Sequence, residues 1–431
     1  MGETLGTLLR AASDPVADVR PPAVAELVAR RRRRTRLRTS GAVLATVATV
    51  VSVAAVVANR PDRSGGRHHV APAISRPRPA VTPVTVGQLA GYRWRAVPTA
   101  PIPPRDGAAM VWTGRQLIVW GGASGSRNFS DGAAYTPATR SWTKLPPSPL
   151  HSGGYAAAVW TGAAMIIWGA DGGAAYFPAT GRWTALPRLA EPADGVRSLV
   201  TGDGRVIAFH GSVGKSAVRA DAYYPTTGQW QGLPELKLPA GHGAAFVAGL
   251  EIGGTPYVWV EWSHNRKDGP NSVETTYGVD GFRLVAGQWR TTQVGPQHGF
   301  DAAEVALVAG QVFFPQTGSS CASCTGPPMS RYGGWQVDPR TGKGQGAPEL
   351  GSVGGGDYVS TGGAVLVLNS SRLETGAHGT KPGDLAAWEP GRRSWQRLPS
   401  APLGAGEQAS VVWAGDRLFV WGSRGGLEFA G

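Results

Sequence analysis

The chain has 431 residues, including 63 Gly, 34 Pro and 16 Trp. Gly costs about 1 kcal/mol and Pro about 3 kcal/mol in a helix interior, so this composition excludes a fold of long helices and favours short strands joined by turns. The net charge is +13, but a dense basic block at residues 30–38 supplies much of it. A nucleic-acid-binding domain needs a basic stripe on its folded surface, so we expect no nucleic-acid partner.

Residues 1–40 are expected to form a short basic tail. Apolar residues recur at helical spacing in 5–9 and in 24–28, on either side of Pro21 and Pro22, which predicts two short helices. A segment of this length cannot bury a core of its own.

Residues 41–58, GAVLATVATVVSVAAVVA, contain no charged side chain. As a helix they span about 27 Å, close to the hydrocarbon core of a bilayer at about 30 Å. The basic block lies immediately before them, and positive flanks stay in the cytoplasm. We therefore expect a single-pass protein of the cell membrane, with residues 41–58 in the bilayer, the N-terminus in the cytoplasm and the rest outside. Cleavage of a signal peptide after Ala58 is the alternative, although such peptides normally start with a short basic stretch.

Residues 59–87 are rich in Pro and in small residues. Such composition favours an extended, semi-rigid spacer. We expect this linker to precede a domain at residues 88–431.

The domain contains a repeated unit. Each copy has two apolar runs separated by a Gly turn, then an aromatic residue with Trp seven positions later; the first copy reads AAMVWTGRQLIVWGG and then YTPATRSWTKLP. The aromatic and Trp pairs are Tyr135 and Trp142, Tyr176 and Trp183, Tyr223 and Trp230, Phe282 and Trp289, and Trp388 and Trp395, while Val337 and Gly344 take these places in the fifth copy. Self-similarity of this kind predicts a propeller or a solenoid.

Each copy predicts four antiparallel strands, of which the first is the innermost. The aromatic residue is expected to open the third strand, and its Trp is expected to lie in the fourth. Six further Trp residues recur at matched positions of the first two strands, which predicts core packing in place of sugar stacking: Trp112, Trp120, Trp160, Trp168, Trp413 and Trp421.

The seventh copy is divided between the two ends of the domain. The C-terminus supplies ASVVWAGDRLFVWGS, and the missing fourth strand matches YRWRAVP around Trp94. A copy begun at one end and completed from the other closes a ring, which removes open sheet edges. The sequence therefore predicts an all-β fold, a seven-bladed β-propeller with Trp94 and Trp413 in one sheet.

This pattern resembles the kelch-repeat and galactose-oxidase-like β-propeller superfamily over residues 87–431. The layout of the whole chain is similar to that of uncharacterised actinobacterial membrane proteins with an extracytoplasmic kelch domain. A galactose-oxidase resemblance implies a copper site with a Cys cross-linked to a Tyr, a second Tyr and two His. Both Cys here lie in one loop of the fifth blade, so no ligand carries over, and we expect neither a cofactor nor a metal.

The two cysteines, Cys321 and Cys324, occur in the loop CASCTGPP. Outside the cell they predict a local disulfide. A zinc site would need two further ligands nearby, and a redox pair would sit at the start of a helix.

The residues that lead into the innermost strands predict a binding site at the mouth of the central channel. Eight positions before the first Gly turn stand Asp106, Asp194 and Glu407. Neighbouring positions add Arg105, His151, His242, His298, Asp301 and Asp357. Convergent polar groups in a concavity are typical of binding sites, although such loops are also polar because they are solvated. A metal held by His242 and His298 is a further alternative.

The function that these features favour is a non-catalytic binding or scaffold module for an extracellular glycan or protein partner. One alternative is a glycoside hydrolase or lyase that uses Asp106, Asp194 and Glu407 as its acids. A second is a transmembrane sensor that signals through its tail, which resembles the layout of membrane-anchored anti-sigma factors but lacks the His or Cys of their zinc motif.

Overall fold

The computed structural model describes residues 82–151, 153–154, 156–189, 196–210, 214–267, 273–292, 305–315, 333–350, 357–369, 381–404, 407 and 409–431. The expected tail, the expected transmembrane helix, most of the expected linker and both cysteines lie outside these residues. Among the helices that are described, none is long and apolar enough to cross a bilayer.

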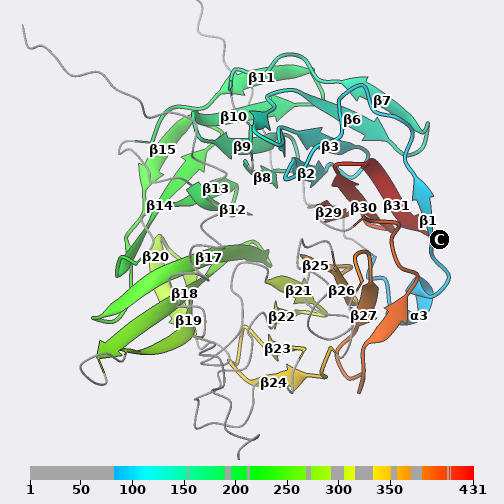
Figure 1. Cartoon of the computed structure of the whole chain (residues 1–431). Helices are drawn as coiled ribbons and strands as arrows, with labels where there is room; N and C mark the ends of the chain where they lie inside the picture. The colour runs from blue at the N-terminus through cyan, green and yellow to red at the C-terminus, as the bar shows by residue number, and fades with distance from the viewer. Residues whose placement is uncertain are drawn as a thin grey trace, which may run out of the picture. The chain divides into compact units, whose positions relative to one another are not determined.

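Within the described residues the strands form seven antiparallel sheets, arranged around a ring as the blades of a β-propeller (Figure 1). Blade one contains β2 (Ala109–Trp112), β3 (Leu117–Trp120), β6 (Gly132–Thr136) and β7 (Ser141–Lys144), with a small hairpin of β4 (Ala123–Ser124) and β5 (Arg127–Asn128). Blade two contains β8 (Ala157–Trp160), β9 (Met165–Gly169), β10 (Gly172–Phe177) and β11 (Arg182–Ala185). Blade three contains β12 (Val196–Gly202), β13 (Arg205–His210), β14 (Ala217–Tyr224), β15 (Gln229–Gly232) and the short β16 (Leu236–Lys237).

The remaining blades follow the same order from the inside outward. Blade four contains β17 (His242–Ile252), β18 (Thr255–Lys267), β19 (Val273–Val285) and β20 (Gln288–Thr292). Blade five contains β21 (Ala306–Val308), β22 (Gln311–Pro315), β23 (Gly334–Val337) and β24 (Gly344–Ala347). Blade six contains β25 (Asp357–Ser360), β26 (Val365–Leu368), β27 (Leu385–Trp388) and β28 (Gln396–Leu398).

Blade seven is built from both ends of the described chain, as predicted. Its strands β29 (Ser410–Trp413), β30 (Arg417–Gly422) and β31 (Gly425–Ala430) come from the C-terminus, and β1 (Arg93–Ala96) pairs with β31 as the outermost strand. Trp94 lies opposite Phe429 in this register. Trp94 and Trp413 therefore belong to one sheet, and the prediction of a ring closed by the two ends is confirmed.

Both faces of each blade are buried, because successive side chains of a strand point to opposite faces. On β3, Leu117 and Val119 pack with residues of blade seven, whereas Ile118 and Trp120 pack with residues of blade two. Seven clusters of this kind lie between successive blades. The six Trp residues of the first two strands contribute to these clusters, which confirms their prediction as core.

The aromatic residue and its Trp face each other across the outer hairpin of a blade. Tyr135 pairs with Trp142, and their ring centroids are 5.1 Å apart. The aromatic residue stands near the end of the third strand, so the expectation that it opens this strand is wrong. A spacing of seven brings two residues together only across a short turn, and that turn follows the aromatic residue directly.

Blade four departs from this register. Trp289 pairs with Leu284, and Phe282 pairs with Thr291. Val285 pairs with Gln288, so only Ala286 and Gly287 form the turn, and both have positive φ. This tighter turn shifts the fourth strand by two residues, so Phe282 and Trp289 are not equivalent to Tyr135 and Trp142.

A hydrogen bond from the Trp of each fourth strand joins neighbouring blades. The Trp142 Nε1–H donates to the carbonyl of Pro98, 2.8 Å away, at the end of the blade-seven outer strand. Equivalent bonds run from Trp94 to Pro399, Trp183 to Pro146, Trp230 to Pro187, Trp289 to Pro234 and Trp395 to Pro348. Blade five carries Gly344 at this position, so the described residues form the bond at six of the seven blade interfaces.

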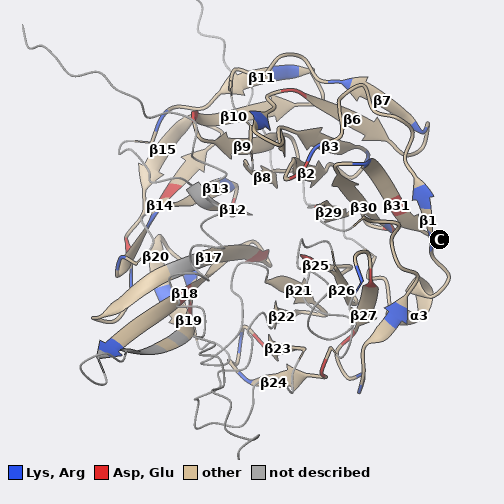
Figure 2. Cartoon of the chain, in the orientation of Figure 1, with Lys and Arg blue, Asp and Glu red and all other residues tan. Residues whose placement is uncertain are grey.

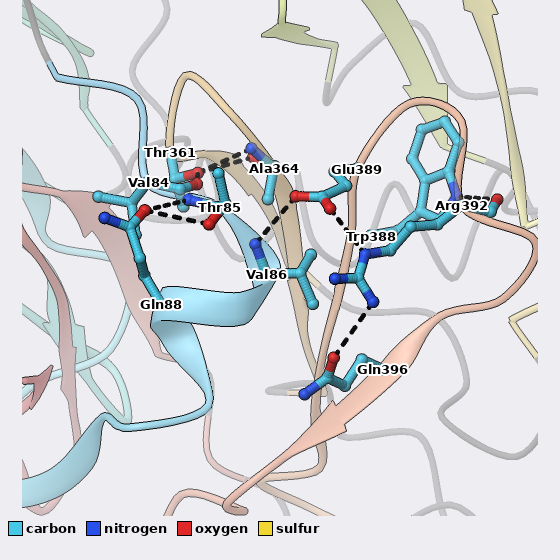
Figure 3. Close-up of polar contacts among 10 residues, drawn as sticks. All are labelled: Val84, Thr85, Val86, Gln88, Thr361, Ala364, Trp388, Glu389, Arg392 and Gln396. Carbon is cyan, nitrogen blue, oxygen red and sulfur yellow. Dashed lines mark hydrogen bonds and ion pairs between the residues drawn. The ribbon is translucent and has the colours of Figure 1, made fainter.

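A strap formed by residues 84–89 fastens the N-terminal side of the domain to blade six (Figure 3). Val84 pairs with Gly362 in a parallel β-bridge, and the Thr361 hydroxyl donates to the carbonyl of Val84 at 2.6 Å. A Cβ atom at Gly363 would lie 2.8 Å from that carbonyl oxygen, so the approach of the strap requires glycine there. The strap begins within the segment expected to be linker.

The strap continues into the short helix α3 (Val86–Leu89), whose first turn is held by Glu389. The Val86 N–H donates to Glu389 Oε2 at 3.0 Å, and Arg392 Nε lies 2.7 Å from Glu389 Oε1 (Figure 3). The Arg392 guanidinium, and less strongly the Val86 N–H, lowers the pKa of Glu389 against the opposing effect of partial burial. Val86 and Leu89 are fully buried in the cluster between blades six and seven.

Replacing Trp142 with Phe tests the bond between blades. The change keeps an aromatic ring but removes the N–H that donates to Pro98, so we expect the free energy of unfolding to fall by about 1.5 kcal/mol. The matched control is Tyr135→Phe, because the Tyr135 hydroxyl is buried with no partner among the described residues. Chemical denaturation should show a loss for Trp142→Phe alone; equal losses would contradict the role of the bond.

Replacing Thr361 with Val tests the strap. The change removes the donor to Val84 and the acceptor for the Ala364 N–H, so we expect a loss of about 2 kcal/mol in the free energy of unfolding. Thr161→Val is the control, because Thr161 makes the same turn contact with Ala164 in blade two, where no strap is bound. Trypsin should cleave after Arg93 faster in Thr361→Val only. Equal cleavage in the two variants would show that Thr361 does not hold the strap.

Candidate functional site

Arg105 lies in the loop that leads into β2 of blade one and is fully buried. Its Nη1 lies 2.5 Å from Asp131 Oδ1, its Nε donates to the carbonyl of Pro103 at 2.8 Å, and its guanidinium stands 3.8 Å from the centroid of the Phe129 ring. A buried guanidinium needs such pairing, because an uncompensated buried charge is costly. Arg105 therefore ties together the loops of blade one, while its Nη2 is buried without a hydrogen-bond partner among the described residues. Its place in the channel-mouth site stays a prediction.

The side chain of Glu407 also makes structural contacts. Its side chain is 6 % exposed, pairs with Arg424 at 3.0 Å and accepts hydrogen bonds from the Gly404 N–H at 2.7 Å and the Ser423 hydroxyl at 3.3 Å. These contacts hold the loop before β29 against the β30–β31 hairpin. The carboxylate of Glu407 is therefore buried and hydrogen-bonded, and its place in the channel-mouth site stays a prediction.

The other described residues of the predicted ring lie in different blades. Asp106 exchanges backbone hydrogen bonds of 2.8 Å with Ala123 in an isolated β-bridge. His151 is exposed, and its backbone N–H donates to Asp171 Oδ2 at 2.7 Å. Asp357 begins the inner strand of blade six. Asp194, His298 and Asp301 lie outside the described residues.

His242, a predicted site residue, lines a cavity. The cavity has a volume of about 360 Å³ and is lined by His242, His264, Arg266 and Thr276. The three strands of the blade-four hairpins align His242, His264 and Thr276 in one cross-strand row, because His242 pairs with His264 and His264 pairs with Thr276. Arg266 follows two positions along β18, on the same face as His264. We call this the blade-four pocket.

Trp262 fixes the orientation of His242. The two ring centroids are 4.0 Å apart, and the His264 ring lies edge-on to His242 at 5.1 Å. Trp262 can lie flat on the sheet because Gly278 stands opposite it; a Cβ atom there would approach the indole to 2.3 Å. His242 Nδ1 and Trp262 Nε1 are both buried without a hydrogen-bond partner among the described residues. These two atoms can therefore form hydrogen bonds with water or with a ligand.

Sequence reasoning included His242 but missed Trp262, His264, Arg266 and Thr276. The alternation of Trp262, His264 and Arg266 at every second position is the signal that was available, because it places all three on one face of a strand. It could not show which residues of β17 and β19 stand opposite them. A register shift between Ala244 and Phe246 also offsets one side of the hairpin.

Basic residues lie on the outer strands of most blades (Figure 2). These strands carry Arg93, Arg95, Lys144, Arg182, Arg290 and Arg397, and none of the seven described outer strands contains Asp or Glu. Charged side chains on edge strands prevent edge-to-edge association. Edge protection explains this charge without a ligand.

A metal centre finds no support among the residues that the structure describes, because no three His, Cys, Asp or Glu side chains there are grouped to hold an ion. The predicted pairing of His242 with His298 is not tested, since His298 is outside the described set. His264 is the histidine that the fold places beside His242.

Comparisons with known proteins add little to this geometry. No protein-family model matches the chain, and no curated protein does. Solved structures do match: one described as "Structure of YjhT" is 15% identical, with 59% of this chain and 87% of that chain covered and a TM-score of 0.40. At this level of similarity we take the architecture from the strand pairing and no function from the match.

Replacing Arg105 with Ala tests its structural role. The change removes the ion pair with Asp131 and the contact with Phe129, so we expect the free energy of unfolding to fall by about 2 kcal/mol. Arg115→Ala, at an exposed turn of the same blade, should change it by less than about 0.5 kcal/mol. Loss of ligand binding without loss of stability in Arg105→Ala would instead return Arg105 to the binding site.

Proposed function

We propose that the chain is a non-catalytic binding module that recognises a glycan or protein partner through blade four. The observation that carries this proposal is the length of β17, β18 and β19, which have 11, 13 and 13 residues. Among the described strands of the other blades, none is longer than the eight residues of β14. These long strands present the blade-four pocket beyond the repeated framework, and sites on strands are more rigid than sites on loops.

The contacts of one predicted acid, Glu407, favour binding over hydrolysis. A glycosidase needs two carboxyl groups that reach one bond of the sugar. Glu407 pairs with Arg424 and accepts hydrogen bonds from Ser423 and the Gly404 N–H. Its carboxylate is therefore not free for proton transfer. The blade-four pocket itself has no Asp or Glu among its described lining residues.

The kelch relationship and the membrane anchor are part of the same proposal. The seven-residue spacing and the Trp hydrogen bonds to the preceding blade support a kelch-like repeat. The apolar run at residues 41–58 and the basic block before it support an anchor with the propeller outside the cell. Under this proposal the partner is an extracytoplasmic molecule that meets the propeller at the cell surface.

The proposal is tested with the full chain purified in detergent, on an array of glycans and against chromogenic glycosides. We expect binding without turnover, and Thr276→Phe should weaken binding at least about tenfold, because a bulky neutral side chain would occupy the pocket. Thr227→Phe, in an exposed turn of blade three, is the matched control and should bind normally. Turnover that is abolished by Asp106→Asn or Glu407→Gln would overturn the proposal in favour of an enzyme.

A further inference from the structure

We infer that the blade-four pocket is an oxyanion site, which binds a carboxylate or phosphate group of the ligand. This inference rests on the proposed binding function and names the chemistry that the site selects. Carboxylate and phosphate share the feature that matters here: several acceptor oxygens around a negative charge.

The residues that line the pocket are donors. Arg266 presents a planar fork that matches two oxygens of one anion. Thr276 contributes a hydroxyl, and His242 and His264 contribute imidazoles, each of which donates from at least one ring nitrogen. No Asp or Glu is among the described lining residues, so an anion in this pocket meets donors from three strands. In the strand register Glu274 stands opposite Arg266.

The exposure of the lining residues decides how a ligand is held. Arg266 is exposed, whereas His242, His264 and Thr276 are half-buried. Arg266 takes part in another interaction already, and its five N–H groups allow it to share its donors with a ligand. We therefore expect Arg266 to supply most of the charge-dependent affinity, since bonds with an ionised donor and acceptor are about twice as strong as neutral ones.

The arrangement is held in place before any ligand arrives. The strand register places His264 between His242 and Thr276, and the close contact between the rings of His242 and Trp262 restricts rotation of the His242 side chain. The Gly214 N–H and the Lys215 carbonyl form hydrogen bonds of 2.9 Å and 2.8 Å with Ala244, so blade three supports the start of β17. Preorganised donors cost less ordering entropy on binding.

Three sugars that differ only at one carbon separate charge from ring recognition. Glucose, glucuronate and glucose 6-phosphate are titrated by calorimetry into the full chain. We expect glucuronate, glucose 6-phosphate or both to bind at least about tenfold more tightly than glucose, since one charged hydrogen bond is worth that factor. Which of the two anions binds more tightly identifies carboxylate or phosphate as the preferred source. Inorganic phosphate should compete with either.

Variants locate the effect. Arg266→Gln should reduce the affinity for the anionic sugars at least about tenfold while leaving glucose unchanged, and His264→Gln should reduce it by a smaller factor. Arg283→Gln, on the exposed outer part of the same blade, is the control and should bind as the parent does. All four lining residues are at least partly exposed, so these variants are expected to fold, and thermal unfolding verifies it.

Two results would overturn the inference. Equal affinity for glucose and for both anions would show that the pocket does not distinguish charged from neutral sugars. Anion binding that is unaffected by Arg266→Gln and His264→Gln would show that the anion binds elsewhere. If none of the three sugars binds, the oxyanion site is also rejected. The proposed function is then tested separately by the glycan array and by the effect of Thr276→Phe.

Discussion

The pairing of β1 with β31 is the contact on which the rest of the molecule depends. Each blade buries both of its faces, so every sheet needs two neighbours, and only a closed ring supplies them. The final blade obtains its outer strand from the other end of the domain, with Trp94 opposite Phe429 and bonded to the carbonyl of Pro399. Glu428, on the same β31, is 1 % exposed and pairs with Arg140 of blade one. Closure thus joins blades six, seven and one through a single strand pair.

The repeat is least regular where the candidate site lies. The blade-four strands are lengthened, and the outer turn of this blade is shortened by two residues. The described residues form no equivalent Trp bond between blades four and five, where Gly344 stands in place of the donor. A Cβ atom at Gly344 would lie 2.3 Å from Trp335 Nε1, so a Trp of the third strand occupies this place instead. Departures from local regularity concentrate at functional sites in natural proteins. The six interfaces joined by a Trp hydrogen bond form a regular framework, and the strand lengths and outer turn of blade four depart from it.

Spacing within one blade could be predicted from the sequence, whereas contacts between segments could not. A spacing of seven between Tyr135 and Trp142 implies a short turn, and the divided seventh copy implies closure; both follow from positions along the chain. The partner of Arg105 is Asp131, and the partners of Glu407 are Ser423 and Arg424, so residues predicted from their position before an inner strand proved to be buried. The position of His264 beside His242 depends on the register of a long hairpin, which no local pattern fixes.

Hydrogen exchange of the β1 amides tests the closed ring most directly. If the two ends close the propeller, the amides of Arg93–Ala96 that bond to β31 open only when the whole domain unfolds, and their protection should equal that of the β30–β31 hairpin. Rapid exchange in Arg93–Ala96, with β30 and β31 still protected, would contradict the account. It would show that the seventh sheet lacks its outer strand and that the ring is not closed by the two ends of the domain.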